Sequence, residues 1–169
     1  MPETSRTPDL PDEYLREIGR IAVTWNRLEN LIQHTLVLAL QDHFAEDARV
    51  LTVFAHMAFP QKLDTLKAML LISQSATGKV FTDYQDKIQP LLKTCQEKRN
   101  NILHQSWSVH EGTVQRFDLK ARGVFKATRL DVSIDELIET TALMVKTNSL
   151  MFQLVTVPLA PKENPQEGQ

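Results

Sequence analysis

The feature that most constrains the fold is a long helical pattern with one charged residue among its apolar positions. It runs from Pro11 to about His43, and its apolar positions recur at alternating spacings of four and three residues, the period of an amphipathic helix. They are Ile18, Ala22, Trp25, Glu29, Ile32, Leu36 and Ala39. Only Glu29 among them is charged. A charged side chain at a core position is costly unless it is paired, so Glu29 requires a partner.

A second helical pattern contains a charged residue of the opposite sign. We expect Thr82 to cap this helix and Pro90 to kink it. Its seam is Tyr84, Ile88, Leu91, Cys95, Arg99 and Ile102. Two interpretations follow for Glu29 and Arg99. Either they form a buried ion pair, which could serve only to fix the register of the two helices, or both converge on a polar cleft between them.

Shorter patterns predict the remaining elements. A helix is expected from Glu46 to Met57, ended by Phe59-Pro60, and a third helix from Pro60 to about Ser73. After Trp107 the period becomes extended. Strands are predicted at 106–110, 114–121 and 124–130, joined through Glu111-Gly112 and Arg122-Gly123.

The clearest helix start is the capping box Ser133-Ile134-Asp135-Glu136, with Val132 and Leu137 placed for a hydrophobic staple. The last helix follows through Leu137, Thr141, Met144, Asn148, Met151 and Val155. The predicted organisation is a single all-α domain at 11–157. It has a β insertion at about 106–130 before the last helix, and disordered tails at 1–10 and 158–169.

Composition excludes several classes of protein. Hydrophobic residues at 42% and charged residues at 24% are typical of a soluble globular chain, and no apolar run reaches the length of a membrane span. The N-terminus lacks the pattern of a signal peptide, and the single cysteine, Cys95, cannot form an internal disulfide. We therefore expect a cytoplasmic protein. The other histidines, His34, His43, His56 and His110, show no ligand spacing, so neither a metal nor a cofactor is predicted.

The second helical pattern ends in Glu97-Lys98-Arg99-Asn100-Asn101-Ile102-Leu103-His104. An Arg, an Asn directly after it and a His five positions on resemble the active-site motif of the HEPN superfamily. Upstream, Trp25-Asn26-Arg27-Leu28-Glu29 is similar to the Trp-x-x-Leu-Glu pattern on the first long helix of one HEPN group. The resemblance covers roughly residues 12 to 156. It implies an antiparallel helical bundle and a metal-independent endoribonuclease whose motif helices meet in a dimer cleft.

Metal-free RNA cleavage needs proton transfer and a cation for the phosphate oxygens. Histidine as a residue type can take up and release protons near neutral pH, so His104 suits the first task, and the guanidinium of Arg99 suits the second. Asn100 would orient the phosphate or His104. One histidine per chain supplies one proton role, so a homodimer that pairs two copies makes chemical sense. We add Trp25, Glu29 and Asn101 as supporting residues.

An ideal helix places Arg99 about 140° from His104, so the two side chains would splay but could still flank one cleft. The alternative for His104 is a helix-terminal histidine that binds the last carbonyls.

The strand region contains the one basic cluster of the sequence: Arg116, Lys120, Arg122, Lys126 and Arg129. These residues could follow an RNA backbone near the cleft. They could instead protect exposed strand edges from aggregation, and the lack of an aromatic platform for stacking bases favours this second interpretation. With a net charge of −2, any RNA contact must come from a local patch.

The leading hypothesis is a metal-independent endoribonuclease, acting as a toxin or defence effector with RNA as substrate and an antitoxin protein as partner. The alternative is a non-catalytic HEPN-like module that binds nucleotide, RNA or protein. A third interpretation is a dimeric helical scaffold without catalysis. The acidic overall balance favours the alternatives, because a nuclease gains from positive charge.

Overall fold

The structure is a computed structural model that describes residues 10–40, 48–73, 78–120 and 126–156. In chain order it contains α1 (Asp12–Ala39), α2 (Ala48–His56), α3 (Phe59–Ser73), α4 (Lys79–Asp83), the π-helical turn η1 (Tyr84–Ile88), α5 (Gln89–Leu103), β1 (Ser106–His110), β2 (Thr113–Lys120), β3 (Lys126–Asp131) and α6 (Ile134–Thr156). The prediction of a mostly helical fold with a small sheet before the last helix is confirmed. Residues 1–9 and 157–169, which include most of the two predicted tails, lie outside the described residues.

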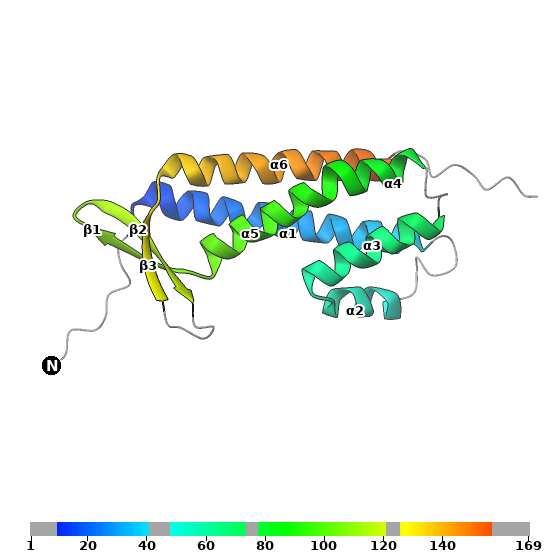
Figure 1. Cartoon of the computed structure of the whole chain (residues 1–169), viewed down its shortest axis with the longest axis horizontal. Helices are drawn as coiled ribbons and strands as arrows, with labels where there is room; N and C mark the ends of the chain where they lie inside the picture. Colours follow the sequence, from blue (N-terminus) through cyan, green and yellow to red (C-terminus); the bar gives the residue numbers. More distant parts are fainter. Residues whose placement is uncertain (1–9, 41–47, 74–77, 121–125, 157–169) are drawn as a thin grey trace, which may run out of the picture.

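The long helices lie side by side, and the sheet caps one end of the bundle (Figure 1). Helices α4, η1 and α5 form one continuous rod, residues 79–103, that runs antiparallel to α1 and α6. Successive helices alternate in direction: α1, α3 and α6 run one way, and α2 and the rod run the other (Figure 1). This alternation agrees with the expected antiparallel bundle.

The core is built from apolar side chains of all four long elements. Fully buried members include Ile21, Leu28 and Ile32 of α1, Leu63 and Leu66 of α3, Leu92 and Ile102 of α5, and Leu137 and Met144 of α6. The predicted seam of α1 is displaced, since Ile21 and Leu28 are buried whereas Ile18 and Glu29 are partly exposed. A helix packed between neighbours on two sides buries a wide stripe, and its centre depends on where those neighbours lie.

The expected cap of the rod is wrong. Thr82 does not cap its helix, because α4 already begins at Lys79 after Gly78. Pro90 lies in the first turn of α5, directly after the π-helical turn. A proline cannot donate to the preceding turn and needs room for its ring, and a π-turn supplies that room. On α5, Leu92 rather than Leu91 is buried, while the other apolar seam residues, Tyr84, Ile88, Cys95 and Ile102, are buried as predicted.

The sheet is a three-stranded antiparallel meander in the order β1-β2-β3, close to the predicted ranges. Glu111 and Gly112 form the first turn with φ of 49° and 78°, the left-handed pair that a two-residue hairpin requires. The Arg122-Gly123 connection lies outside the described residues. The Tyr14 hydroxyl donates to the Val132 carbonyl at 3.1 Å, which ties the end of the sheet to α1.

The start of α6 follows the predicted capping box in part. The Glu136 N–H donates to Ser133 Oγ at 3.2 Å, and Val132 and Leu137 are both buried. The Glu136 carboxylate is directed elsewhere, with Oε1 3.4 Å from Arg116 Nη2. This ion pair joins the sheet to α6.

Candidate functional site

Arg99, Asn100 and His104 lie together at the C-terminal end of α5, which we call the motif end. Helix α5 stops at Leu103, and His104 leaves the helical conformation with φ −109° and ψ 2°. This non-helical backbone brings His104 towards Arg99 despite the splay of an ideal helix. Arg99 Nη1 donates to Asn100 Oδ1 at 2.9 Å and to His104 Nε2 at 2.5 Å.

The contact between Arg99 and His104 fixes the tautomer of the imidazole. A guanidinium has donors only, so His104 Nε2 must be the acceptor and the ring proton must lie on Nδ1. The His104 side chain is exposed, and its backbone N–H donates to the Asn100 carbonyl at 3.2 Å. The ring is therefore held by Arg99, and no hydrogen bond within the described part of the chain joins it to the last carbonyls of α5.

Arg99 rests on the face of Trp25. Its Cζ lies 5.5 Å from the centroid of the indole, within the range of a cation–π contact. Trp25 is 2% exposed and packs on Phe59 with ring centroids 4.5 Å apart. Because core packing fixes the indole, it forms a rigid platform for the guanidinium.

Glu29 does not pair with Arg99, so that interpretation is wrong. Its Oε1 accepts from Lys62 Nζ at 2.9 Å and its Oε2 accepts from Trp25 Nε1 at 3.2 Å. The partner of Glu29 is the ammonium group of Lys62 on α3. The apolar patterns of α1 and α5 alone cannot reveal a partner on a third helix. Glu29 and Arg99 instead contact the edge and the face of one indole.

Two buried charged residues escaped the sequence analysis. The Lys62 side chain is only 3% exposed, and its position four residues before Leu66 was the available signal that it shares the buried face of α3. Glu17 is buried on α1, where Oε1 lies 2.5 Å from Arg20 Nη1 and Oε2 accepts from the Thr141 hydroxyl at 3.5 Å. A period that starts at Glu17 and continues through Ile21 and Trp25 would have found it.

Arg116 supports the motif end rather than a free basic surface. Its Nη1 donates to the Asn101 carbonyl at 3.3 Å, while Nη2 pairs with Glu136 as described above. Its side chain is 14% exposed. Arg116 therefore connects the last turn of α5 to the sheet and to α6. The Asn101 side chain is exposed, so only its backbone takes part in this connection.

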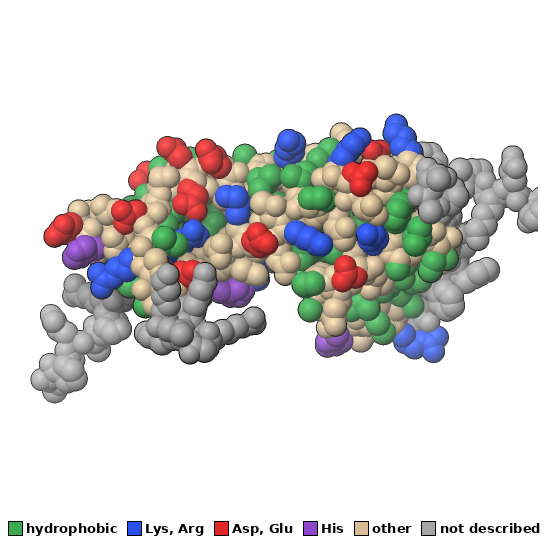
Figure 2. Space-filling view, viewed as in Figure 1, with side chains coloured by type: hydrophobic (Ala, Val, Ile, Leu, Met, Phe, Trp, Pro, Cys, Tyr) green, Lys and Arg blue, Asp and Glu red, His purple; other side chains and the backbone are tan. Residues whose placement is uncertain are grey.

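Among the remaining members of the basic cluster, the structure describes only the side chain of Arg129. Arg129 is exposed and lies over Phe117, with Cζ 5.4 Å from the ring centroid. Arg122 and the side chains of Lys120 and Lys126 lie outside the described residues. On the face shown in Figure 2, Lys and Arg side chains are interspersed with Asp and Glu. The described residues therefore provide only Arg129 as an exposed member of the cluster.

Several buried polar atoms near the motif end have no hydrogen-bond partner in the described ranges. They are Arg99 Nε, Gln105 Oε1, Gln115 Oε1 and Arg116 Nε. Buried polar atoms are normally paired, so each of these atoms calls for a partner such as a water or a ligand atom. Arg99 Nε leaves Arg99 a donor in addition to Nη1, which already contacts His104 and Asn100.

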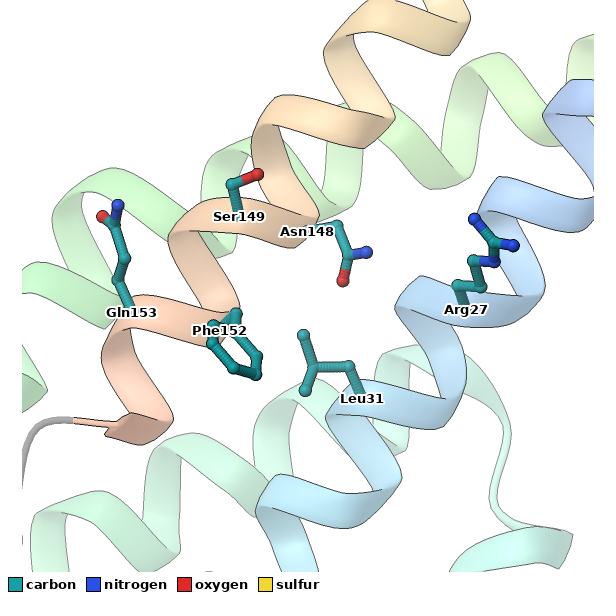
Figure 3. Close-up of a pocket in the computed structure, with 6 residues that line it drawn as sticks. All are labelled: Arg27, Leu31, Asn148, Ser149, Phe152 and Gln153. Carbon is teal, nitrogen blue, oxygen red and sulfur yellow. The ribbon is translucent and has the colours of Figure 1, made fainter.

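The other concave and apolar surfaces do not coincide with the motif end. A groove of about 540 Å³ lies between α1 and α6, lined by Arg27, Leu31, Asn148, Ser149, Phe152 and Gln153, none of them a predicted site residue (Figure 3). On α6, the exposed residues Ile138, Val145 and Phe152 recur every seven residues.

Over the described ranges, no three His, Cys, Asp or Glu side chains are grouped to hold a metal ion. None of the described helices combines the length and apolarity that a bilayer span needs. Comparisons with protein-family models, curated proteins and solved structures found no match to this chain.

Proposed function

We propose that the protein is a metal-independent endoribonuclease whose site is the motif end. The observation that carries the proposal is the contact of Arg99 with both His104 and Asn100 at an exposed helix terminus. A fixed cation beside an imidazole is the pairing that phosphodiester cleavage requires, because one group binds the phosphate and the other moves a proton. The resemblance of the motif to that of HEPN nucleases supports the same chemistry.

The geometry suggests the order of events. His104 Nε2 is occupied by Arg99 in the free protein, so it cannot yet accept a proton. A phosphate that draws Arg99 towards its oxygens would expose the Nε2 lone pair. Nε2 then takes the proton of the ribose 2′-OH as the 2′-oxygen attacks phosphorus. The P–O5′ bond breaks, the 5′-oxygen gains a proton, and the products are a 2′,3′-cyclic phosphate and a 5′-OH.

The second proton role calls for a second copy of the chain. Each chain has one histidine at the motif end, so His104 of one protomer acts as base, and its counterpart across a two-fold axis enters the step as an imidazolium and gives its proton to the 5′-oxygen. We therefore propose a composite site in a homodimer with the two motif ends facing. In this proposal the protein is a cytoplasmic toxin or defence effector, and an antitoxin protein would be its partner.

Cleavage assays test the chemistry. In EDTA, single-stranded RNA should be cut to fragments with 2′,3′-cyclic phosphate ends. Loss of one acid–base group costs about 10²–10⁴-fold in rate, so His104→Ala should nearly abolish cutting. His110→Ala is the matched control, since His110 is an exposed histidine on β1. A folded His104→Ala that cuts at the wild-type rate would refute the proposal. A dimer that binds RNA without cutting would favour the non-catalytic module.

Mixing experiments test the composite site. If both histidines of a dimer are needed, activity in randomised mixtures of wild type and His104→Ala should follow the square of the wild-type fraction. A linear dependence would show that each protomer acts alone. Light scattering should give twice the 19.3 kDa of one chain. Val145→Glu places a charge on the exposed face of α6 and should leave that mass unchanged. A dimer broken by this change would instead be built on α6.

A further inference from the structure

Arg99 and Glu29 carry opposite charges and contact the same indole, yet Glu29 is paired with Lys62. Oε1 of Glu29 is taken by Lys62 and Oε2 by the Trp25 N–H. Arg99 in turn lies on the ring face and donates to His104 and Asn100. Each charge therefore has its own partners, and the two sets meet only at Trp25.

Without Lys62 this separation would be unstable. A carboxylate binds a guanidinium through short, often bidentate, charge-assisted hydrogen bonds. Those bonds are stronger than a cation–π contact or a hydrogen bond to a neutral imidazole. Glu29 is 31% exposed and is not locked in place by burial alone. If Lys62 no longer bound Glu29 Oε1, that oxygen would be free to accept a hydrogen bond from Arg99.

We propose that Lys62 is a positioning residue that keeps Glu29 occupied, so that Arg99 stays available for a phosphate group. The inference rests on the proposed function in taking Arg99 as the phosphate-binding residue. It also accounts for a buried lysine where an apolar residue would pack at lower cost, because ion pairs of this kind are often replaced by hydrophobic residues without loss of stability. In this proposal Lys62 contributes to phosphate binding, because it prevents Arg99 from pairing with Glu29.

The test uses inorganic phosphate as the probe and NMR as the readout. Phosphate is titrated into the full-length protein while the Nε–Hε signal of Arg99 and the ring signals of His104 are followed. Lys62→Met should weaken phosphate binding about tenfold, the equivalent of ~1.4 kcal/mol. Before any phosphate is added, the Arg99 signal should already be displaced, because the guanidinium has moved to Glu29. Adding Glu29→Gln to Lys62→Met should restore most of the lost affinity.

Two further variants make the outcome unambiguous. Lys87→Met is the matched control, since it removes a lysine paired with Asp83 at 2.6 Å elsewhere on the rod and should leave phosphate binding unchanged. Glu29→Gln alone removes the competing charge and keeps one acceptor oxygen. It should bind phosphate at least as tightly as wild type. This variant decides the question if Lys62→Met does not fold.

Three results would overturn the inference: wild-type affinity in a folded Lys62→Met, weakened affinity that Glu29→Gln fails to restore, or no response of Arg99 to phosphate in the wild type. The experiment is independent of RNA cleavage. If phosphate binding behaves as expected but no RNA is cut, the positioning role of Lys62 stands and the nuclease proposal fails. If RNA is cut but Lys62→Met binds phosphate normally, the reverse holds.

Discussion

The buried face of the rod formed by α4, η1 and α5 differs from the motif end of the same rod in how its polar groups are paired. On the buried face, the Tyr84 hydroxyl donates to the Leu63 carbonyl at 3.0 Å, and Cys95 Sγ lies 3.5 Å from Thr147 Oγ1. Both groups are buried and paired inside the protein. At the motif end, Asn100 and His104 are exposed, and Arg99 Nε has no hydrogen-bond partner in the described ranges.

The difference separates groups that hold the fold from groups that can meet a ligand. Burial raises the pKa of Tyr84 well above its ordinary value and raises the pKa of Cys95, so both stay neutral. A neutral, buried, paired group has little left to offer a substrate. Trp25 lies between these two sets of groups, with Arg99 on its face and the Glu29–Lys62 pair at its edge. The following substitutions test which residues hold the fold and which can meet a ligand.

The largest effect on stability should come from Glu29→Ala. It leaves the ammonium of Lys62 buried without its carboxylate, and breaking a buried pair from one side costs about 3–5 kcal/mol. We expect about 3 kcal/mol, at the lower end of that range, because Glu29 is partly exposed. Urea melts measure the loss. A loss in the free energy of unfolding as small as that for an exposed ion pair would show that Glu29 does not hold the fold and belongs with the exposed groups of the motif end.

Tyr84→Phe should have the next largest effect. The change removes the hydrogen bond to the Leu63 carbonyl and leaves the aromatic ring in place, so we expect a loss of about 1–2 kcal/mol in the free energy of unfolding. Phosphate binding and RNA cleavage at the motif end should be unaffected. If phosphate binding or RNA cleavage changed while the unfolding transition did not, the separation between the buried face of the rod and the motif end would be contradicted.

Arg99→Met should affect stability least among these substitutions. It keeps the apolar stem over Trp25 and removes the cation–π contact, which is worth about 0.5–1 kcal/mol in such settings. Function should respond far more, because the phosphate-binding cation is lost. If Arg99→Met instead unfolds the protein, the motif end is structural and the nuclease proposal loses its main support.

The pH dependence of stability should report the ionisation of the buried groups Tyr84 and Cys95, and the effect is absent near neutral pH. Tyr84 and Cys95 have ordinary pKa values of 10.0 and 9.0, both raised in the folded protein. The unfolded chain therefore releases these protons first, and stability that is complete below about pH 9 falls as the pH rises further. The Tyr84→Phe, Cys95→Ala double variant should lose less stability between pH 8 and about pH 10.5. An unchanged alkaline slope would show that other groups dominate.

Much of the fold could be predicted because its signals are local. The period of the apolar residues located every long helix, and the change of period after Trp107 located the strands. The Glu111-Gly112 turn and the Ser133 cap depend on backbone preferences of two to four adjacent residues. The centres of the buried faces were less accurate, because the neighbouring helices decide which side of a helix is covered: Ile21 and Leu28 are buried on α1 where Ile18 and Glu29 were expected, and Leu92 is buried on α5 where Leu91 was expected.

The sequence by itself determined which charged residues stand at costly positions, and so directed attention to Glu29, Arg99 and Trp25. Only the tertiary structure decided their partners. Lys62 reaches Glu29 from a helix 33 positions along the chain, and nothing in either helical pattern ranks it above Arg99. Likewise, the backbone of His104 turns out of the helix and brings its ring onto Arg99. Periodicity specifies which side of a helix is buried, but the choice between nearby partners depends on packing between helices, where interactions distant in sequence compete.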